Sequence, residues 1–207
     1  MSYQTEQERF WTTDFGNDYI SRNNNESLIS SNVHLFSKIL NCTRGVNSIC
    51  ELGCNIGLNL IALNRINKNY DLRGYEINSK AAQIAKEHQI SEIIQTSVIE
   101  KLDDSKKFDL VFTKLVLIHI NPSLLDSVYE NLYNISNKYI MVCEYYNPTP
   151  VSVEYRGHQD KLFKRDFAGE LINKFKVELI DYGFQYKLDG DFIGTDSTWF
   201  LLKKINV

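Results

Sequence analysis

Short apolar runs alternate along this chain with longer segments whose apolar residues recur at helical spacing. Val46–Glu51 is one such run, ending just before a glycine, and it predicts a buried strand. In the next segment, Ile56–Ile66, apolar residues fall three or four positions apart, which is typical of a helix packing on a core. The alternation continues, with strands expected at Asp71–Glu76, Ile93–Ser97, Phe108–Thr113 and Tyr139–Glu144, and helices expected at Ser79–His88 and from Pro122 to about Asn134.

Two further apolar runs, Phe175–Phe184 and Thr198–Lys203, predict a final hairpin pair of strands. Strands that alternate with helices imply an α/β fold, in which a mostly parallel sheet carries helices on both faces. Ligands of such sheets bind beyond the carboxyl ends of the strands, near the point where the strand order reverses. We therefore expect the residues that carry chemistry to follow the strands directly.

Composition narrows the class of protein. The 207 residues are 43% hydrophobic and 24% charged, as in an ordinary globular domain, and the net charge of −3 argues against a nucleic-acid partner. The N-terminal residues lack the apolar core of a secretory signal, and the most apolar window, Phe108 to Ile120, is too short and polar to span a bilayer. We expect a cytoplasmic monomer or homodimer with a small-molecule substrate, no membrane or nucleic-acid partner and no metal. Four cysteines lack zinc-site spacing and are interpreted as reduced thiols: Cys42, Cys50, Cys54 and Cys143.

The first predicted strand ends in a loop of the form E-x-G-x-x-x-G, residues 51–57. Gly53 allows a sharp turn, and Gly57 allows the start of the helix to pack close to the strand. The new helix offers free backbone N–H groups to a ligand. Glu51 stands directly before the turn, where it would repel a pyrophosphate but would accept hydrogen bonds from an ammonium group. The plainer interpretation is a strand–turn–helix junction with incidental glycines.

Polar residues also follow the next three strands. Glu76 lies 23 residues after Gly53, near the offset at which an acid reaches ribose hydroxyls, although an exposed acid at a strand end is the alternative. Ser97 follows the third strand, where it meets an adenine or merely forms a turn. His119, beyond the fourth strand, is either a general base or a buried histidine that orders the loop.

These residues together resemble the class I S-adenosylmethionine-dependent methyltransferases, over roughly Ile49 to Glu144. Two further segments, Phe10–Asn23 and Glu144–Ala168, resemble a narrower group, the pseudaminic acid biosynthesis-associated methylases. The resemblance implies a single Rossmann-like methyltransferase domain, residues 1–207, with a seven-stranded, mostly parallel sheet and a C-terminal antiparallel strand. One departure is Asn55, which replaces the middle glycine of the usual loop; Asn tolerates positive φ better than most residues.

The resemblance also implies where S-adenosylmethionine binds and where its product S-adenosylhomocysteine forms. An N-terminal helical lid, residues 1–35, would fold over the donor, with Tyr19 and Arg22 as candidates for its methionyl carboxylate. An amphipathic helix that simply packs on the core is the alternative for this segment. The candidate donor-binding residues are Tyr19, Arg22, Glu51, Gly53, Cys54, Asn55, Gly57, Glu76, Ile77, Ser97, Val98 and Lys114.

The segment 145–170 is a polar, aromatic and locally basic insert at the edge where acceptors are expected. Aromatic rings and amides suit a sugar and basic groups suit a phosphate or carboxylate, whereas a solvated loop is the alternative. His119 and His158 are the candidate bases. The candidate acceptor-binding residues are Tyr145, Tyr146, Asn147, Tyr155, Arg156, Lys164 and Arg165.

The leading hypothesis is methyl transfer to an oxygen or nitrogen of a small anionic or nucleotide-linked precursor of a bacterial surface glycan, such as a capsule or nonulosonate. A small phosphate, phosphoramidate or other metabolite is an alternative acceptor. A catalytically silent donor-binding partner subunit is a second class, although Gly53 and Glu76 are both present. A nucleotide-dependent oxidoreductase is a third, and Glu51 before the turn argues against it.

Overall fold

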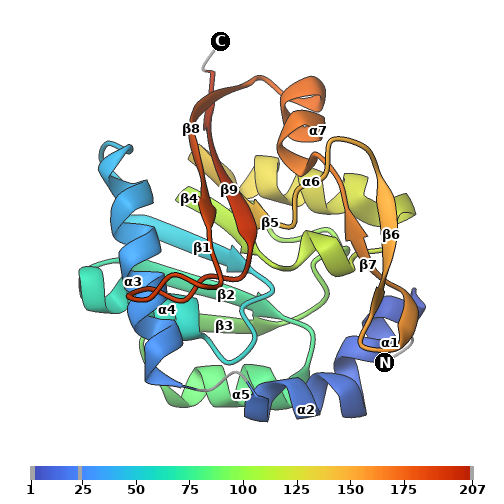
Figure 1. Ribbon diagram of the computed structural model, residues 1–207. Coiled ribbons are helices and arrows are strands. Elements are labelled where there is room, and N and C mark those ends of the chain that lie inside the picture. Colours follow the sequence, from blue (N-terminus) through green and yellow to red (C-terminus); the bar gives the residue numbers. More distant parts are fainter. Residues whose placement is uncertain (1–2, 23–24, 206–207) are drawn as a thin grey trace.

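A computed structural model describes residues 3–22 and 25–205, without the side chains of residues 21 and 22. Its centre is a seven-stranded sheet in the order β3-β2-β1-β4-β5-β9-β8 (Figure 1). Neighbouring strands from β3 to β5 are parallel, whereas β9 is antiparallel to both β5 and β8. The expected fold class, including the C-terminal antiparallel strand, is confirmed. The strands are β1 Ser48–Leu52, β2 Asp71–Glu76, β3 Glu92–Gln95, β4 Phe108–Lys114, β5 Ser136–Glu144, β8 Val177–Gln185 and β9 Ser197–Lys204.

Helices cover both faces of this sheet. On β5 the side chains alternate: Ile140 and Val142 pack in the core beneath α6 and α7, while Met141 packs in the core beneath α3, α4 and α5. This period of two is the pattern of a strand buried on both faces. No helix in the described ranges is long and apolar enough to cross a membrane. The helices are α3 Glu26–Asn41, α4 Leu58–Ile66, α5 Ser79–Glu87, α6 Leu125–Ile135 and α7 Phe167–Lys174.

The N-terminal segment expected as a lid divides into two parts. Two short helices, α1 Glu6–Thr12 and α2 Asp14–Arg22, lie at one end of the molecule (Figure 1). The longer α3 belongs instead to the central fold, because its Phe36 and Ile39 are fully buried against α4 and the sheet. We call the two short helices α1 and α2 the cover.

The insert is more regular than a loop. It contains a two-stranded antiparallel hairpin, β6 Val151–Tyr155 with β7 His158–Lys164, which lies beside α1 (Figure 1). A helix expected to start at Pro122 begins with the 3-10 turn η2, Pro122–Leu124, and continues as α6. No clear period-two pattern marks β6 along the chain, because its residues are mostly exposed on both faces.

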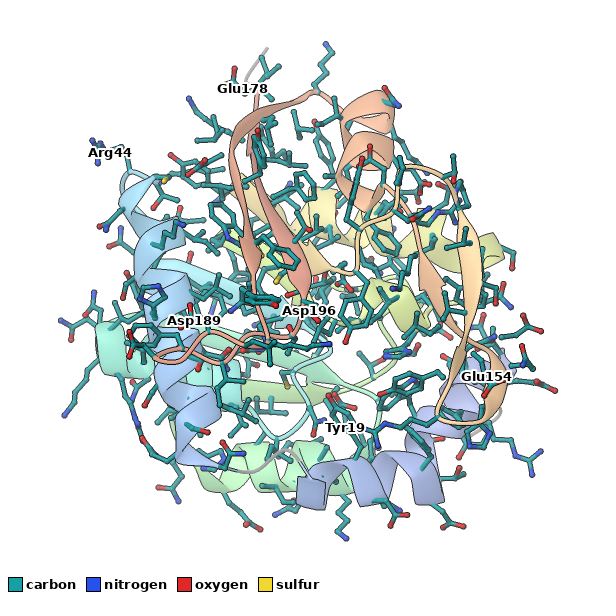
Figure 2. All side chains as sticks on the ribbon, in the orientation of Figure 1. Tyr19, Arg44, Glu154, Glu178, Asp189 and Asp196 are labelled. Atoms are coloured by element: carbon teal, nitrogen blue, oxygen red, sulfur yellow. The ribbon has the colours of Figure 1, made fainter. Side chains whose placement is uncertain are left out.

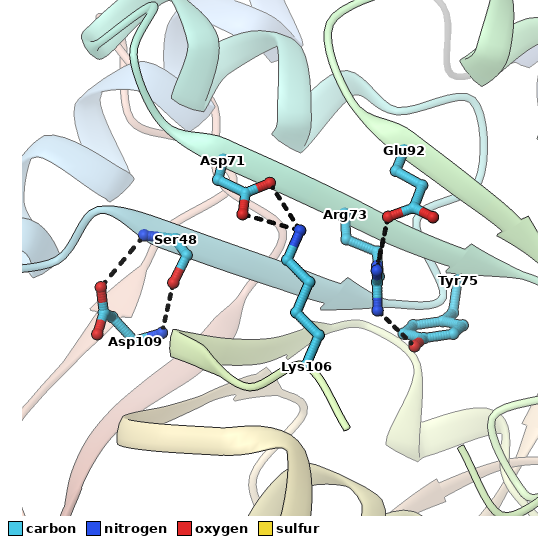
Figure 3. A network of polar contacts seen from close by, with 7 residues as sticks. All are labelled: Ser48, Asp71, Arg73, Tyr75, Glu92, Lys106 and Asp109. Carbon is cyan, nitrogen blue, oxygen red and sulfur yellow. Dashed lines mark hydrogen bonds and ion pairs between the residues drawn. The ribbon is translucent and has the colours of Figure 1, made fainter. Parts of the chain in front are cut away.

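Near the amino-terminal ends of the parallel strands, polar contacts join neighbouring strands and loops (Figure 3). Arg73 on β2 is buried and pairs with Glu92 on β3 at 2.6 Å, and Lys106 pairs with Asp71 at 2.9 Å. At the start of β1, the Ser48 hydroxyl accepts the Asp109 N–H at 3.0 Å. These polar side chains are paired with one another, so this end of the sheet serves stability. The space for a ligand lies at the opposite end, beyond the carboxyl ends of the strands.

Candidate active site

A cavity of about 210 Å³ lies at the carboxyl ends of β1, β2 and β4, where the strand order reverses. Its floor comes from the residues that follow these strands. Its roof comes from the cover, including Trp11 of α1 and Tyr19 of α2. Tyr19 projects from α2 towards the strand ends (Figure 2). The expectation that the chemical residues follow the strands is therefore met by the geometry.

The glycine loop after β1 has the conformation that its sequence requires. Gly53 has φ 79°, and a Cβ there would lie only 2.6 Å from Val116 Cγ2, so the loop after β4 packs directly on it. Asn55 has φ 48°, which confirms that asparagine adopts the left-handed conformation in place of the usual glycine. Gly57, at φ 82°, precedes α4 and packs towards Ala85 of α5. A Cβ on Gly57 would make only an ordinary contact with Ala85, at 3.4 Å, so the positive φ is what favours glycine at this position.

Glu51 is a fully buried carboxylate facing this cavity. Asn59, in the first turn of α4, donates its amide Nδ2–H to Glu51 Oε1 at 2.5 Å. The other carboxylate oxygen, Oε2, has no hydrogen-bond partner among the described residues. Burial raises the pKa of Glu51 to about 8, and the Asn59 hydrogen bond opposes that shift. A buried acceptor without a partner is the feature that a cationic ligand would complete.

Glu76 ends β2 with its carboxylate 8% exposed. Its two oxygens accept backbone N–H groups from either side, Oε2 from Asn55 at 2.7 Å and Oε1 from Asn78 at 2.8 Å. Burial raises the pKa of Glu76, and the backbone N–H groups oppose the shift. These contacts fix the carboxylate in one orientation, with its remaining lone pairs available at the cavity.

Glu144, at the end of β5, holds the loop after β4. Its oxygens accept the backbone N–H groups of Val116 at 3.2 Å and Ile118 at 3.4 Å. Burial raises the pKa of Glu144 to about 7, and these N–H groups oppose the shift. Leu115, which lines the cavity, has φ 58°, a conformation that bulky residues rarely adopt. This role of Glu144 was not predicted from the sequence. The available signal was an acidic residue at the end of an apolar, buried run.

His119 lies between the cavity and the insert. Its Nδ1 is 2.6 Å from the carbonyl oxygen of Lys161 on β7, and because a carbonyl only accepts, Nδ1 carries the proton. The neutral ring therefore presents an unprotonated Nε2. Trp11 and Tyr155 pack on the ring at centroid distances of 4.6 and 5.0 Å. Burial lowers the pKa of His119 to about 4, so the ring stays neutral near neutral pH.

The structure brings most of the candidate donor-binding residues together. Gly57 lies outside the cavity, and the side chain of Arg22 is outside the described residues. Asn59 and Asn32 also line the cavity and were missed. For Asn59 the available signal was a polar residue in the first helical turn after Glu51. The candidates that line the cavity are Tyr19, Glu51, Gly53, Cys54, Asn55, Glu76, Ile77, Ser97, Val98 and Lys114.

The candidate acceptor-binding residues do not line this cavity. Arg165 pairs with Glu170 of α7 at 2.7 Å, so its charge is already engaged within the fold. His158 packs against Phe10 of the cover at a centroid distance of 5.0 Å and lies outside the cavity. The remaining candidates lie on or beside the hairpin: Tyr145, Tyr146, Asn147, Tyr155, Arg156 and Lys164.

Comparisons with known proteins agree with this architecture. The family described as "Methyltransferase domain" matches residues 50–136, the part that contains β1 to the end of α6. No curated protein sequence matches the chain. The solved structures described below have sequence identities of 15% or less to this chain, so their likeness shows the fold alone.

Three of these structures illustrate the likeness. The plantazolicin methyltransferase BpumL in complex with SAH has a TM-score of 0.67 at 15% identity, over 96% of this chain and 94% of that one. Magnesium protoporphyrin IX methyltransferase from Synechocystis PCC 6803 with bound SAM gives 0.67 at 14% identity, over 99% and 100%. The glycopeptide N-methyltransferase MtfA complexed with SAM gives 0.63 at 9% identity, over 86% and 94%. The class I methyltransferase fold is confirmed, and the family match supports an enzyme with S-adenosylmethionine as its donor.

Proposed function

We propose that this chain is a methyltransferase that uses S-adenosylmethionine and methylates an oxygen or nitrogen of a small acceptor. One observation carries the proposal. Three buried acceptor oxygens without a partner among the described residues belong to side chains that line one cavity: Glu51 Oε2, Asn55 Oδ1 and Asn59 Oδ1. A ligand that satisfies them must bring several N–H or O–H donors. The ammonium and ribose hydroxyl groups of S-adenosylmethionine supply such donors.

The chain's residues fit the donor part by part. Glu51 and Asn59 would accept from the methionyl ammonium, and Glu76 would accept from the ribose hydroxyls. The side chain of Lys114 has no hydrogen bond or ion pair to another described residue. It would meet the methionyl carboxylate, together with Tyr19 and Arg22 of α2, which the resemblance implies. The adenine would lie near the turn after β3, beside the residues that line the cavity there: Ile77, Ser97 and Val98.

The donor, when bound, supplies a methyl group that its sulfonium already activates. The protein's task is then to hold acceptor and methyl group in line, which contributes many kcal/mol to such transfers. His119 is the proposed base, because its Nδ1–H is committed to Lys161 and Nε2 is free to take a proton. A base of pKa about 4 is weak, so His119 would take the acceptor's proton only while the bond to the methyl group forms, when the acceptor atom becomes more acidic.

For the acceptor we propose a small anionic or nucleotide-linked precursor of a bacterial surface glycan. The support is the resemblance of Phe10–Asn23 and Glu144–Ala168 to the pseudaminic acid biosynthesis-associated methylases. The hairpin adds exposed polar groups next to the cover, among them Arg156 and His158. The small phosphate or phosphoramidate acceptor remains the alternative within the same chemistry.

Two measurements test the proposal in sequence. Isothermal titration of the purified chain with S-adenosylmethionine, S-adenosylhomocysteine and NADH should show binding of the first two and none of the third. Absence of binding to both methionine-derived ligands would overturn the donor assignment. Incubation with methyl-labelled donor and a panel of sugar nucleotides, capsule precursors and small phosphates then tests the acceptor. Label transfer to the uncharged members alone would overturn the anionic class.

A further inference from the structure

The cover is too small to hold its position unaided. α1 has 7 residues and α2 has 9, whereas isolated helices shorter than roughly 12–15 residues are marginal in water. Both helices nevertheless place side chains at the cavity, Trp11 from α1 and Tyr19 from α2. Their position must therefore come from contacts with the rest of the fold.

Asn78, on the floor of the cavity, makes two polar contacts with the cover. Its side chain is buried, at 4% exposure, and it follows Glu76 by two positions. The Asn78 amide Nδ2 donates to the carbonyl oxygen of Trp11 at 2.9 Å and to Asn17 Oδ1 at 3.1 Å. One side chain thus holds the end of α1 and the middle of α2.

The other groups of Asn78 are also engaged. Its Oδ1 accepts the backbone N–H groups of Lys80 and Ala81, both at 3.0 Å, and so caps α5. Its backbone N–H donates to Glu76 Oε1 at 2.8 Å. The residue therefore connects three parts: the cover, the start of α5 and the carboxylate proposed to hold the ribose.

The first turn of α2 lies close to this contact. A Cβ on Gly16 would lie 1.9 Å from the Trp11 carbonyl oxygen and 3.0 Å from Asn78 Nδ2, so only glycine fits beside the hydrogen bond. Apolar packing of Ile20 with Ile56 and Ala81 supports α2 nearby. This packing has no direction, whereas the two amide hydrogen bonds fix where the cover sits.

We propose that Asn78 is a positioning residue that holds the cover closed over the donor and couples its closure to occupancy of the Glu76 carboxylate. The identity of the ligand rests on the proposed function. A ribose that donates to Glu76 fixes the carboxylate to which the Asn78 N–H is bonded, and this stabilises the turn from which the amide reaches the cover. By linkage, a closed cover strengthens donor binding to the same extent.

Asn78→Ser tests this directly. Serine is also a good N-cap, so α5 keeps its cap, but its hydroxyl is too short to reach Trp11 and Asn17. The matched control is Asp166→Ser, the corresponding exchange at the N-cap of α7, where Asp166 Oδ1 accepts the Gly169 N–H at 2.8 Å far from the cover. Hydrogen–deuterium exchange of residues 6–22 is measured without ligand, and donor affinity and dissociation rate are measured by stopped flow.

We expect the amides of α1 and α2 to exchange roughly tenfold faster in Asn78→Ser, with exchange in α5 and the control unchanged. Donor affinity should fall about tenfold, mainly through faster dissociation. Asn17→Ala should reproduce part of the loss and add nothing to Asn78→Ser, since both remove the same contact.

Wild-type exchange in the cover of Asn78→Ser would overturn the proposal, as would faster exchange confined to α5. Faster exchange in the cover with unchanged donor affinity would overturn the coupling. If the wild-type chain binds no donor, the proposed function fails, and exchange in the unliganded variants still decides whether Asn78 holds the cover.

Discussion

Glu51→Gln gives the sharpest test of the donor site. The substitution removes the charge, keeps the shape of the side chain and leaves an oxygen that can accept from Asn59. Glu51 is fully buried and its pKa is raised to about 8, so in the empty cavity it is largely protonated at neutral pH. Only the ionised form pairs with the donor's ammonium. Donor binding near neutral pH must therefore release a proton.

The magnitude follows from that pKa. Below about pH 8, each unit by which the pH falls should weaken wild-type donor binding about tenfold, because the carboxyl proton must be removed before the donor binds. Above it, Glu51→Gln lacks a charge-assisted hydrogen bond and should bind the donor about 30-fold more weakly, roughly 2 kcal/mol. At about pH 6.5 the wild-type advantage should disappear, because protonation of Glu51 has by then removed about 30-fold of its affinity.

Isothermal titration between about pH 6 and pH 9, in buffers of different ionisation enthalpy, measures both affinity and proton release. Glu87→Gln, the same exchange at an exposed position of α5, is the control and should match the wild type throughout. A wild-type affinity that is flat across this range, with Glu51→Gln equal to it, would refute the reasoning.

The same pKa fixes the sign of the effect on stability. The folded-state pKa of Glu51 lies above its unfolded value of 4.5, so the folded state binds the proton more tightly. Stability from this group is therefore present below pH 4.5 and is lost as the pH rises through about 8. Without donor, Glu51→Gln should melt at a higher temperature than the wild type above about pH 8 and at the same temperature near pH 4.5. A lower melting temperature for the variant above pH 8 would contradict a buried charge at this position.

Three further variants probe the remaining parts of the site. Glu76→Gln places an amide N–H₂ against one of two backbone N–H groups. Donor affinity, measured by isothermal titration, should fall at least tenfold, which is roughly the loss of one charge-assisted hydrogen bond. Unchanged affinity would exclude Glu76 from the ribose site. His119→Ala should lower kcat at saturating donor about 100-fold with an acceptor found in the panel. The wild-type kcat should show no titration near pH 6.5, because the pKa of His119 is about 4, and such a titration would contradict the buried ring. Gly53→Ala should destabilise the protein by about 1–3 kcal/mol in thermal melts, since the new Cβ meets Val116. Val116→Ala in that background should restore part of the loss, and no rescue would argue against the close approach.

The positions of the candidate residues at the strand ends could be predicted because these positions are fixed locally. Glu51, Gly53 and Glu76 each stand directly at the end of a strand, and parallel strands bring their carboxyl ends to one edge whatever the rest of the chain does. Asn55 could be predicted for a related reason: its left-handed conformation is a property of the turn itself.

The supporting residues could not be predicted in the same way. Glu144 reaches the loop after β4 only because β4 and β5 are adjacent in the sheet, and Asn78 reaches Trp11 across 67 positions of sequence. No local pattern encodes such pairs, since any buried acid or amide would look the same along the chain.

The hairpin and the cover form one continuous contact, which explains why the candidate acceptor residues lie outside the cavity. Gln7 of α1 donates to the Asp160 carbonyl oxygen at 2.9 Å, and Lys161 of β7 pairs with Glu6 at 3.2 Å. The Lys161 carbonyl holds His119 beneath them. A cover bound to the hairpin on one side and to Asn78 on the other cannot open over the donor without also changing the surroundings of His119. If the chain functions as proposed, donor exchange and acceptor placement would therefore depend on the same two short helices.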